Sequence, residues 1–155
     1  MRYILDTNIF LFYLKDEDTW DFIESTYDPF GSNNDAIVSV VTIGEIKAIA
    51  QKNKWGKRRI RIIEELFDDL LVVDVTYGAL LDTYATLDAF SQGKLFQPDD
   101  AKFSAKNMGK NDLWIAATAV VAGAELLTSD KDFSHLDGRY LRVNLIENLD
   151  SSVNS

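Results

Sequence analysis

Short apolar runs alternate along the chain with longer stretches in which apolar residues recur at helical spacing. The first run, Tyr3-Ile4-Leu5, leads directly into Asp6. Apolar runs of this length, bounded by polar residues, predict buried strands. The same pattern predicts further strands at residues 36–40, 70–75, 126–130 and 142–146. The first run is typical of a strand that is covered on both faces, as in a parallel sheet.

Helices are predicted between these strands. Apolar residues in helical patterns place them at residues 9–14, from 19 onward, after 42 to about 52, 60–67, 76–90 and 111–123. Thr19 and Thr76 are predicted to begin two of them. Thr42 and Glu45 have the spacing of a capping box, in which each side chain binds a free backbone N–H of the other residue. Polar stretches with Gly, Pro and Asn predict loops at 28–35 and 91–110.

The alternation of strands and helices predicts an α/β fold with a mainly parallel central sheet flanked by helices. With 155 residues, of which 46% are hydrophobic and 26% charged, the chain is expected to form one globular domain. We expect this domain to cover residues 1–147 and a frayed tail to follow at 148–155.

Composition excludes several classes of protein. The chain has no cysteine, so it has neither a disulfide nor a thiolate nucleophile. Only three apolar residues stand between Arg2 and Asp6, which does not match a signal peptide. The longest low-polarity run, 113–124, is too short to span a membrane. We therefore expect a cytoplasmic protein without a membrane partner.

The formal net charge of −9 argues against a protein that grips nucleic acid over its whole surface. The basic residues are nevertheless concentrated, because six of them lie between Lys52 and Arg61. This run is interpreted either as a solvated helix face or helix junction, or as a surface that contacts phosphates or a partner. The candidate contacts to RNA or a partner are Lys54, Lys57, Arg58, Arg59 and Arg61.

Four carboxylates share one predicted location. Asp6 and Asp130 end strands, whereas Glu45 and Asp112 lie at the beginning of helices. In an open α/β sheet all of these positions lie at one edge, beyond the carboxyl ends of the strands. Two of them also have a purely structural interpretation, since Asp6 is a good helix N-cap and Glu45 belongs to the capping box described above.

A cluster of carboxylates is unfavourable without a cation, because two like charges about 4 Å apart repel by about 4 kcal/mol at a surface-like dielectric. Ligands that are oxygen only suit Mg²⁺ or Mn²⁺. A zinc site of usual composition is excluded, since His135 is the sole histidine and is interpreted as a loop residue. Such a metal site favours hydrolysis of a phosphoester.

Residues next to the acids are candidates to orient carboxylates or waters. They are Thr7, Asn8, Asn111 and Thr128. The alternative for each is a role as a cap or turn residue.

The chain resembles the PIN-domain ribonucleases and, among them, the VapC-type toxins of prokaryotic toxin–antitoxin pairs. The resemblance rests on Leu5-Asp6-Thr7-Asn8, on the segment from Val40 to Ile46, on Asn111 to Ala119 and on Leu127 to Phe133. The segment around Asp112 is the most specific of them. The matching segments occur in the family's order and span nearly the whole chain.

This resemblance implies a parallel-sheet α/β fold and endoribonuclease activity that depends on Mg²⁺ or Mn²⁺. By position, Asp6, Glu45, Asp112 and Asp130 match the acidic residues of the family, so they are the expected catalytic and metal-binding residues. The resemblance also implies an RNA substrate, a cognate antitoxin protein and a homodimer. Residues 91–110 match nothing in the family pattern.

Two other functions are compatible with the sequence. A phosphatase of the haloacid-dehalogenase type would also place Asp6 after the first strand, but it requires a second Asp where this chain has Asn8. A non-catalytic α/β binding module would use the acids only as caps and solvated side chains. The second possibility does not explain why four acids gather at one edge.

Overall fold

The computed structural model describes residues 1–95 and 104–149. Its five strands form a single sheet in the order β3-β2-β1-β4-β5, and every neighbouring pair is parallel. The strands are β1 (Arg2–Leu5), β2 (Asp35–Ser39), β3 (Leu71–Val73), β4 (Glu125–Thr128) and β5 (Val143–Leu145). The predicted α/β fold is therefore confirmed, and the sheet is parallel throughout.

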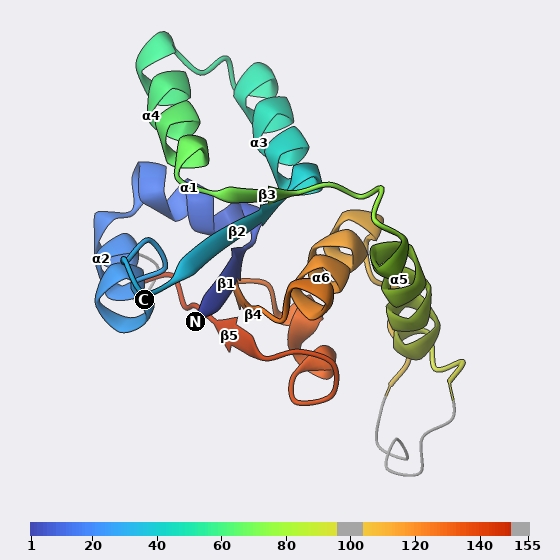
Figure 1. Cartoon of the computed structure of the whole chain (residues 1–155). Helices are drawn as coiled ribbons and strands as arrows, with labels where there is room; N and C mark the ends of the chain where they lie inside the picture. The colour runs from blue at the N-terminus through green and yellow to red at the C-terminus, as the bar shows by residue number, and fades with distance from the viewer. Residues whose placement is uncertain (96–103, 150–155) are drawn as a thin grey trace.

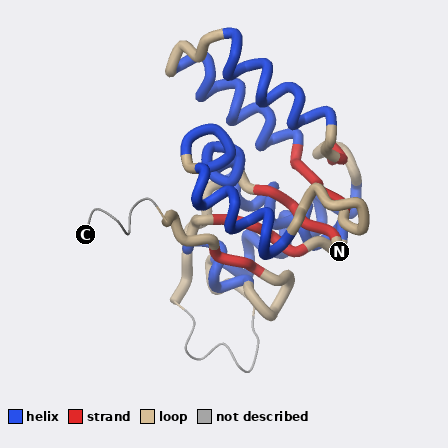
Figure 2. Tube along the Cα trace, turned by 90° about the vertical axis from the view of Figure 1, so that its left-hand side faces the viewer, coloured by secondary structure: helices blue, strands red, loops and turns tan. Residues whose placement is uncertain are grey.

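Helices cover both faces of this sheet (Figure 1, Figure 2). The α-helices are α1 (Thr7–Lys15), α2 (Glu17–Tyr27), α3 (Val40–Lys52), α4 (Lys57–Asp68), α5 (Gly78–Ser91) and α6 (Lys110–Ala122). A 3₁₀ helix, η2 (Lys131–Leu136), follows β4. Among the described residues, no helix is long and apolar enough to cross a membrane.

The central strand β1 divides the hydrophobic core into two layers. Tyr3 and Leu5 pack with α1 to α4 on one face, whereas Ile4 packs with α5, α6 and η2 on the other. This follows from the alternation of side chains along a strand. Because both faces are covered, the apolar residues of the interior strands β1, β2 and β4 are buried.

Helix α6 lies against the sheet through small side chains. Ala116, Ala117 and Ala119 are completely buried, and small side chains allow the helix axis to approach its neighbours closely. The helix ends at Gly123, whose φ of 60° is a left-handed conformation that glycine adopts without strain. The predicted helix and its glycine end are confirmed.

Helices α3 and α4 form an antiparallel hairpin that projects from the sheet at the top of Figure 1 and again in Figure 2. The basic run lies at its tip and includes the end of α3, the junction and the start of α4. Within this junction Trp55 is buried, while Lys54 has a φ of 50°.

Two predicted helix starts are wrong. Helix α2 is capped by the carboxylate of Asp16, which accepts the Thr19 N–H at 2.9 Å, and it begins before Thr19. Helix α5 begins at Gly78 after Tyr77, not at Thr76. In both cases several nearby residues can cap or begin a helix, and the packing of the helix selects among them.

The predicted capping box of α3 is also wrong. The N-cap is Ser39, the last residue of β2, whose Oγ accepts the Val41 N–H at 3.2 Å. Thr42 is completely buried, and its hydroxyl has no hydrogen-bond partner among the described residues. The helix follows β2 without a loop, so the cap lies three residues earlier than predicted and leaves Glu45 free for another role.

Two loop predictions fall partly on residues outside the described ranges. Residues 91–110 were predicted as a loop, but Ser91 ends α5, Lys110 begins α6, and residues 96–103 lie outside the description. Of the predicted tail at 148–155, residues 150–155 also lie outside it. The backbone N–H of Leu149 donates a hydrogen bond to the Thr19 hydroxyl at 2.9 Å.

The two candidate caps of α3 predict opposite effects of mutation. We expect Ser39→Ala to lower the free energy of unfolding by about 1 kcal/mol, because it removes the N-cap. We expect Thr42→Val to leave it unchanged or raise it by up to about 1 kcal/mol, because it removes a buried hydroxyl without a partner. Urea denaturation of both variants measures this difference. A larger loss for Thr42→Val than for Ser39→Ala would restore the capping box.

Candidate active site

The carboxyl ends of the parallel strands bring the predicted acids together. Asp6 follows β1, and Asp130 lies between β4 and η2. Glu45 is in the second turn of α3, which starts where β2 ends, and Asp112 is in the first turn of α6. The charges of Glu45 and Asp130 both raise the pKa of Asp6, so these side chains lie within electrostatic reach of one another.

Asp6 is the most buried of these acids, with 5% of its surface exposed. Its side chain caps α1 by accepting the Thr7 N–H at 2.7 Å. It also accepts a hydrogen bond from the Thr128 hydroxyl at 2.6 Å. Burial raises the pKa of Asp6 to about 6, even though both hydrogen bonds favour the charged form. The cap and the site are therefore two roles of the same carboxylate.

Thr7 and Thr128 link the acids to one another. The Thr7 hydroxyl donates to Glu45 Oε1 at 3.2 Å, so this residue contacts Asp6 through its backbone and Glu45 through its side chain. The Thr128 hydroxyl accepts the Asp130 N–H at 3.0 Å while it donates to Asp6. A continuous chain of hydrogen bonds therefore joins Glu45, Asp6 and Asp130 across three elements.

The pKa of Asp112 depends on burial and on the charges of the other acids in the cluster. Burial and, to a smaller extent, the charges of four other acids together raise this pKa to about 7. These acids are Asp6, Asp130, Glu45 and Asp132. In the absence of a cation the site therefore holds on to protons near neutral pH, which is the response of crowded carboxylates that lack a positive partner.

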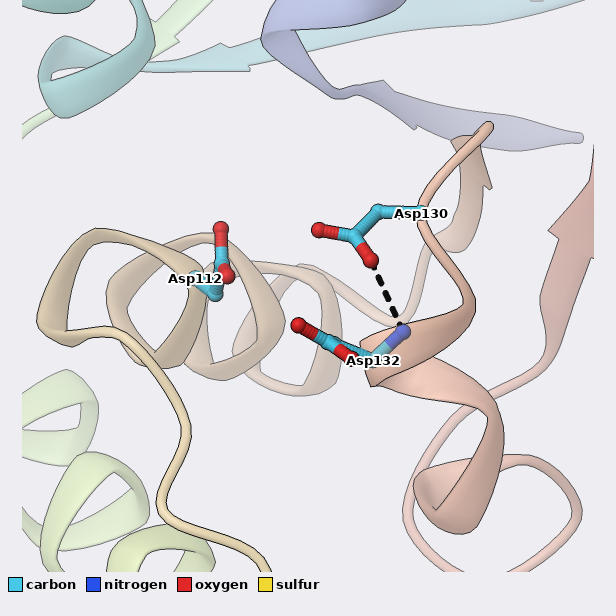
Figure 3. Close-up of side chains that lie close together, drawn as sticks. All are labelled: Asp112, Asp130 and Asp132. Carbon is cyan, nitrogen blue, oxygen red and sulfur yellow. Dashed lines mark hydrogen bonds between the residues drawn. The ribbon is translucent and has the colours of Figure 1, made fainter.

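Three of the acids have the geometry of a metal site. One carboxylate oxygen each from Asp112, Asp130 and Asp132 lies within 4.8 Å of the other two. Figure 3 shows Asp112 on α6 facing Asp130 and Asp132, which extend from the segment after β4. Asp130 Oδ1 accepts the Asp132 N–H at 2.8 Å and so caps η2. A donor set made of carboxylate oxygens fits Mg²⁺ or Mn²⁺.

Asp132 was not among the site residues that the sequence predicted. The residue comes two positions after Asp130, and the tight 3₁₀ turn brings its carboxylate back toward α6. Its position two residues after Asp130, an acid that ends a strand, could have indicated a role in the site. The direction of the Asp132 side chain, however, depends on the type of turn that follows the strand.

Two of the four residues predicted to support the carboxylates do so. Thr7 and Thr128 make the hydrogen bonds described above. Asn8 and Asn111 are exposed, and in the described part of the chain neither makes a side-chain hydrogen bond to these acids. Asn8 instead lines a cleft of about 810 Å³ together with Lys15, Ser129 and Lys131, and none of the five acids lines this cleft.

His135 lies in a different environment. Its ring stacks on Phe90 with an interplanar angle of 5°, and its Nε2 is 2.8 Å from the Ser91 hydroxyl. Burial lowers its pKa. These contacts join η2 to the end of α5, so His135 acts in packing. It belongs to the 3₁₀ helix η2 and not to the loop that the sequence suggested.

Comparisons with known proteins agree with this architecture. The family described as PIN domain matches residues 3–139. Among solved structures, VapBC2 from Rickettsia felis bound to a promoter DNA fragment has a TM-score of 0.72 at 20% identity, covering 95% of this chain and 100% of that chain. VapBC-1 from nontypeable Haemophilus influenzae has a TM-score of 0.70 at 25% identity, covering 94% and 98%. A toxin–antitoxin complex from Klebsiella pneumoniae has a TM-score of 0.67 at 16% identity, covering 95% and 99%. A search of curated proteins found no significant match.

The raised pKa of Asp112 gives the metal-free protein a defined pH dependence. The folded state binds this proton more tightly than the unfolded chain, whose carboxyl titrates near 3.8. The stability that this group contributes is therefore complete below about pH 4 and is lost as the pH rises toward about 7. We expect Asp112→Asn to stabilise the protein in EDTA at about pH 8 by about 1–2 kcal/mol, since solvent screens a half-buried carboxylate.

Thermal unfolding in EDTA near pH 8 and near pH 4 measures this effect. Asp21→Asn is a matched control, because Asp21 is exposed on α2. Stabilisation by Asp112→Asn that has the same size at both pH values would contradict the explanation based on crowded charges.

Proposed function

Because the chain belongs to the PIN domain family, we propose that it is a metal-dependent endoribonuclease that hydrolyses RNA phosphodiester bonds. The observation that carries the proposal is the convergence of five carboxylates at one edge of the sheet, where burial and the charges of the other four acids raise the pKa of Asp112 to about 7. A cluster of this kind is unfavourable unless a cation or protons neutralise it. A divalent cation and a polyanionic substrate are consistent with that requirement.

Asp112, Asp130 and Asp132 would hold the Mg²⁺ or Mn²⁺ ion, with Asp6 and Glu45 near it. A cation bound there supplies positive charge to the phosphoryl oxygens and lowers the pKa of a coordinated water. The protein's own contribution is orientation. Hydrogen bonds from Thr7 and Thr128 fix the carboxylates of Glu45 and Asp6, so their positions do not depend on side-chain freedom.

The structure weakens the alternative of a non-catalytic module. That alternative relied on Glu45 as part of a capping box, whereas Glu45 accepts a hydrogen bond from Thr7 at the site. The family match likewise supports a nuclease over a phosphatase.

We further propose that the chain is the toxin of a type II toxin–antitoxin pair, with a cognate antitoxin as its protein partner and a homodimer as its assembly. The support is that the similar structures above are described as VapBC or toxin–antitoxin complexes. The match covers almost the whole of those chains as well as this one.

Cleavage of RNA tests the enzyme directly. We expect the purified protein to cut a mixed pool of structured and single-stranded RNA in Mg²⁺ or Mn²⁺ and not in EDTA. We expect Asp112→Asn to lower the rate by about 100-fold or more, since it removes a charge that the reaction centre requires. Gel analysis of the fragments measures both effects.

Asp21→Asn again serves as the control, and it should cut like the wild type. Equal cutting by the wild type and Asp112→Asn would identify a contaminating nuclease. If neither protein cuts, calorimetry with Mn²⁺ provides a second test, and absence of metal binding would overturn the proposal.

Growth of a bacterial host tests the toxin assignment separately. We expect induction of the wild type to arrest growth, because an active endoribonuclease degrades RNA that the cell needs. Asp112→Asn, at equal protein level by immunoblot, should not arrest growth. A wild type that cuts RNA in vitro but leaves growth unchanged would be a nuclease outside a toxin pair.

A further inference from the structure

The tip of the α3–α4 hairpin concentrates the positive charge of an acidic protein. Its basic residues are Lys52, Lys54, Lys57, Arg58, Arg59 and Arg61, and we refer to them as the basic tip. All six are exposed. No acid occurs between Glu45 and Glu64. The remainder of the chain is therefore more acidic than the net charge of −9 suggests.

The charges of the basic tip are not neutralised by the protein. In residues 1–95 and 104–149, none of the six forms an ion pair. The guanidinium of Arg59 lies 5.5 Å from the centre of the Trp55 ring, which holds its position without reducing its charge. Electrostatic repulsion among these residues favours binding of an anionic partner.

The start of α4 adds to this positive potential. Its N-cap is Gly56, which provides no side-chain cap, and no acid lies in its first turn. The N-terminus of a helix carries a partial positive charge that normally favours acids. Here Lys57, Arg58 and Arg59 occupy the first turn instead. Such an arrangement is unfavourable for the isolated helix and favourable for contact with an anion.

The basic tip is connected to the carboxylate cluster by a single rigid element. Lys52 comes seven residues after Glu45 on α3, so both lie on the same face of the helix, about 10 Å apart along its axis. At the stacked spacing of about 3.4 Å per nucleotide, this distance corresponds to roughly three nucleotides. A strand whose phosphate lies at the carboxylates can therefore reach the basic tip.

A shallow cleft at the basic tip indicates which groups can contact RNA there. It has a volume of about 540 Å³ and is lined by Lys54, Arg58 and Arg59 together with Leu14 and the buried Trp55. Because Trp55 is only 8% exposed, its ring is not free to stack on a base. The available donors are ammonium and guanidinium groups, which bind phosphates and do not read base identity.

We infer that the basic tip binds the RNA backbone roughly three nucleotides from the phosphodiester that is cut. This inference rests on the proposed nuclease function and adds a sequence-independent positioning surface to it. An RNA strand supplies one phosphate per nucleotide, which suits a cluster of six exposed cations that begins at Lys52, on the face of α3 that carries Glu45. The affinity for RNA substrates that are too short to reach the basic tip does not depend on it.

Fluorescence anisotropy with a single-stranded RNA of about twelve nucleotides tests the inference. The protein carries Asp112→Asn to prevent cleavage. We expect Arg58→Gln with Arg61→Gln to weaken binding roughly 10-fold near 0.1 M salt and to reduce the slope of log affinity against log salt by about 1.4. A dinucleotide should bind both proteins equally.

The matched control is Arg2→Gln with Arg142→Gln, which removes the same charge at the opposite edge of the sheet, where β1 and β5 begin. It should leave RNA affinity and the salt slope unchanged, and thermal unfolding verifies that each variant is folded.

An unchanged slope for the tip variant would overturn the inference. Binding of poly-glutamate to the tip as tightly as RNA would instead identify an acidic protein segment as its partner. Failure of the wild type both to cut RNA and to bind Mn²⁺ contradicts the proposed function, and the salt slope still tests the basic tip.

Discussion

The hydrogen bond from the Thr128 hydroxyl to the buried carboxylate of Asp6 is the contact on which the arrangement of the acids depends. It joins the first strand of the chain to the strand β4 beside it at the point where both end. A carboxylate that is 5% exposed requires such donors, because burial of an unsatisfied charge is costly. Thr128 also accepts the Asp130 N–H, so a single hydroxyl determines the relative positions of two acids.

The parallel sheet supplies the rest of the constraint. All strands point the same way, so side chains that follow them converge whether or not their charges are compatible. The apolar core holds them there, and burial together with their mutual repulsion raises the pKa values of Asp6 and Asp112. Stability and chemistry are thus opposed at this edge, which is common where a site is maintained for function.

Much of this could be read from the sequence, because the strands and the acids after them depend on local pattern. The apolar run before Asp6 predicted a strand that ends at this acid. The run of small residues after Asp112 predicted a helix that begins near this acid. Details that depend on competition between similar residues could not be read in this way. Ser39 and Thr42 are both capable caps, and only the direct passage from β2 into α3 selects Ser39. Asp132 was missed because its orientation depends on a 3₁₀ turn that its sequence does not distinguish from other turns.

The separation of Asp6 and Thr128 by 122 positions has a consequence for synthesis of the protein. The first strand emerges from the ribosome long before β4, its partner in the sheet, and parallel pairing over such a separation is slow to form. Asp130 and Asp132 follow later still in the chain. The carboxylate cluster therefore cannot assemble on a nascent chain until most of the sequence has been translated. Until then, β1 lacks one of its two neighbours, and the unpaired backbone N–H and C=O groups along that edge are exposed to other chains or to chaperones.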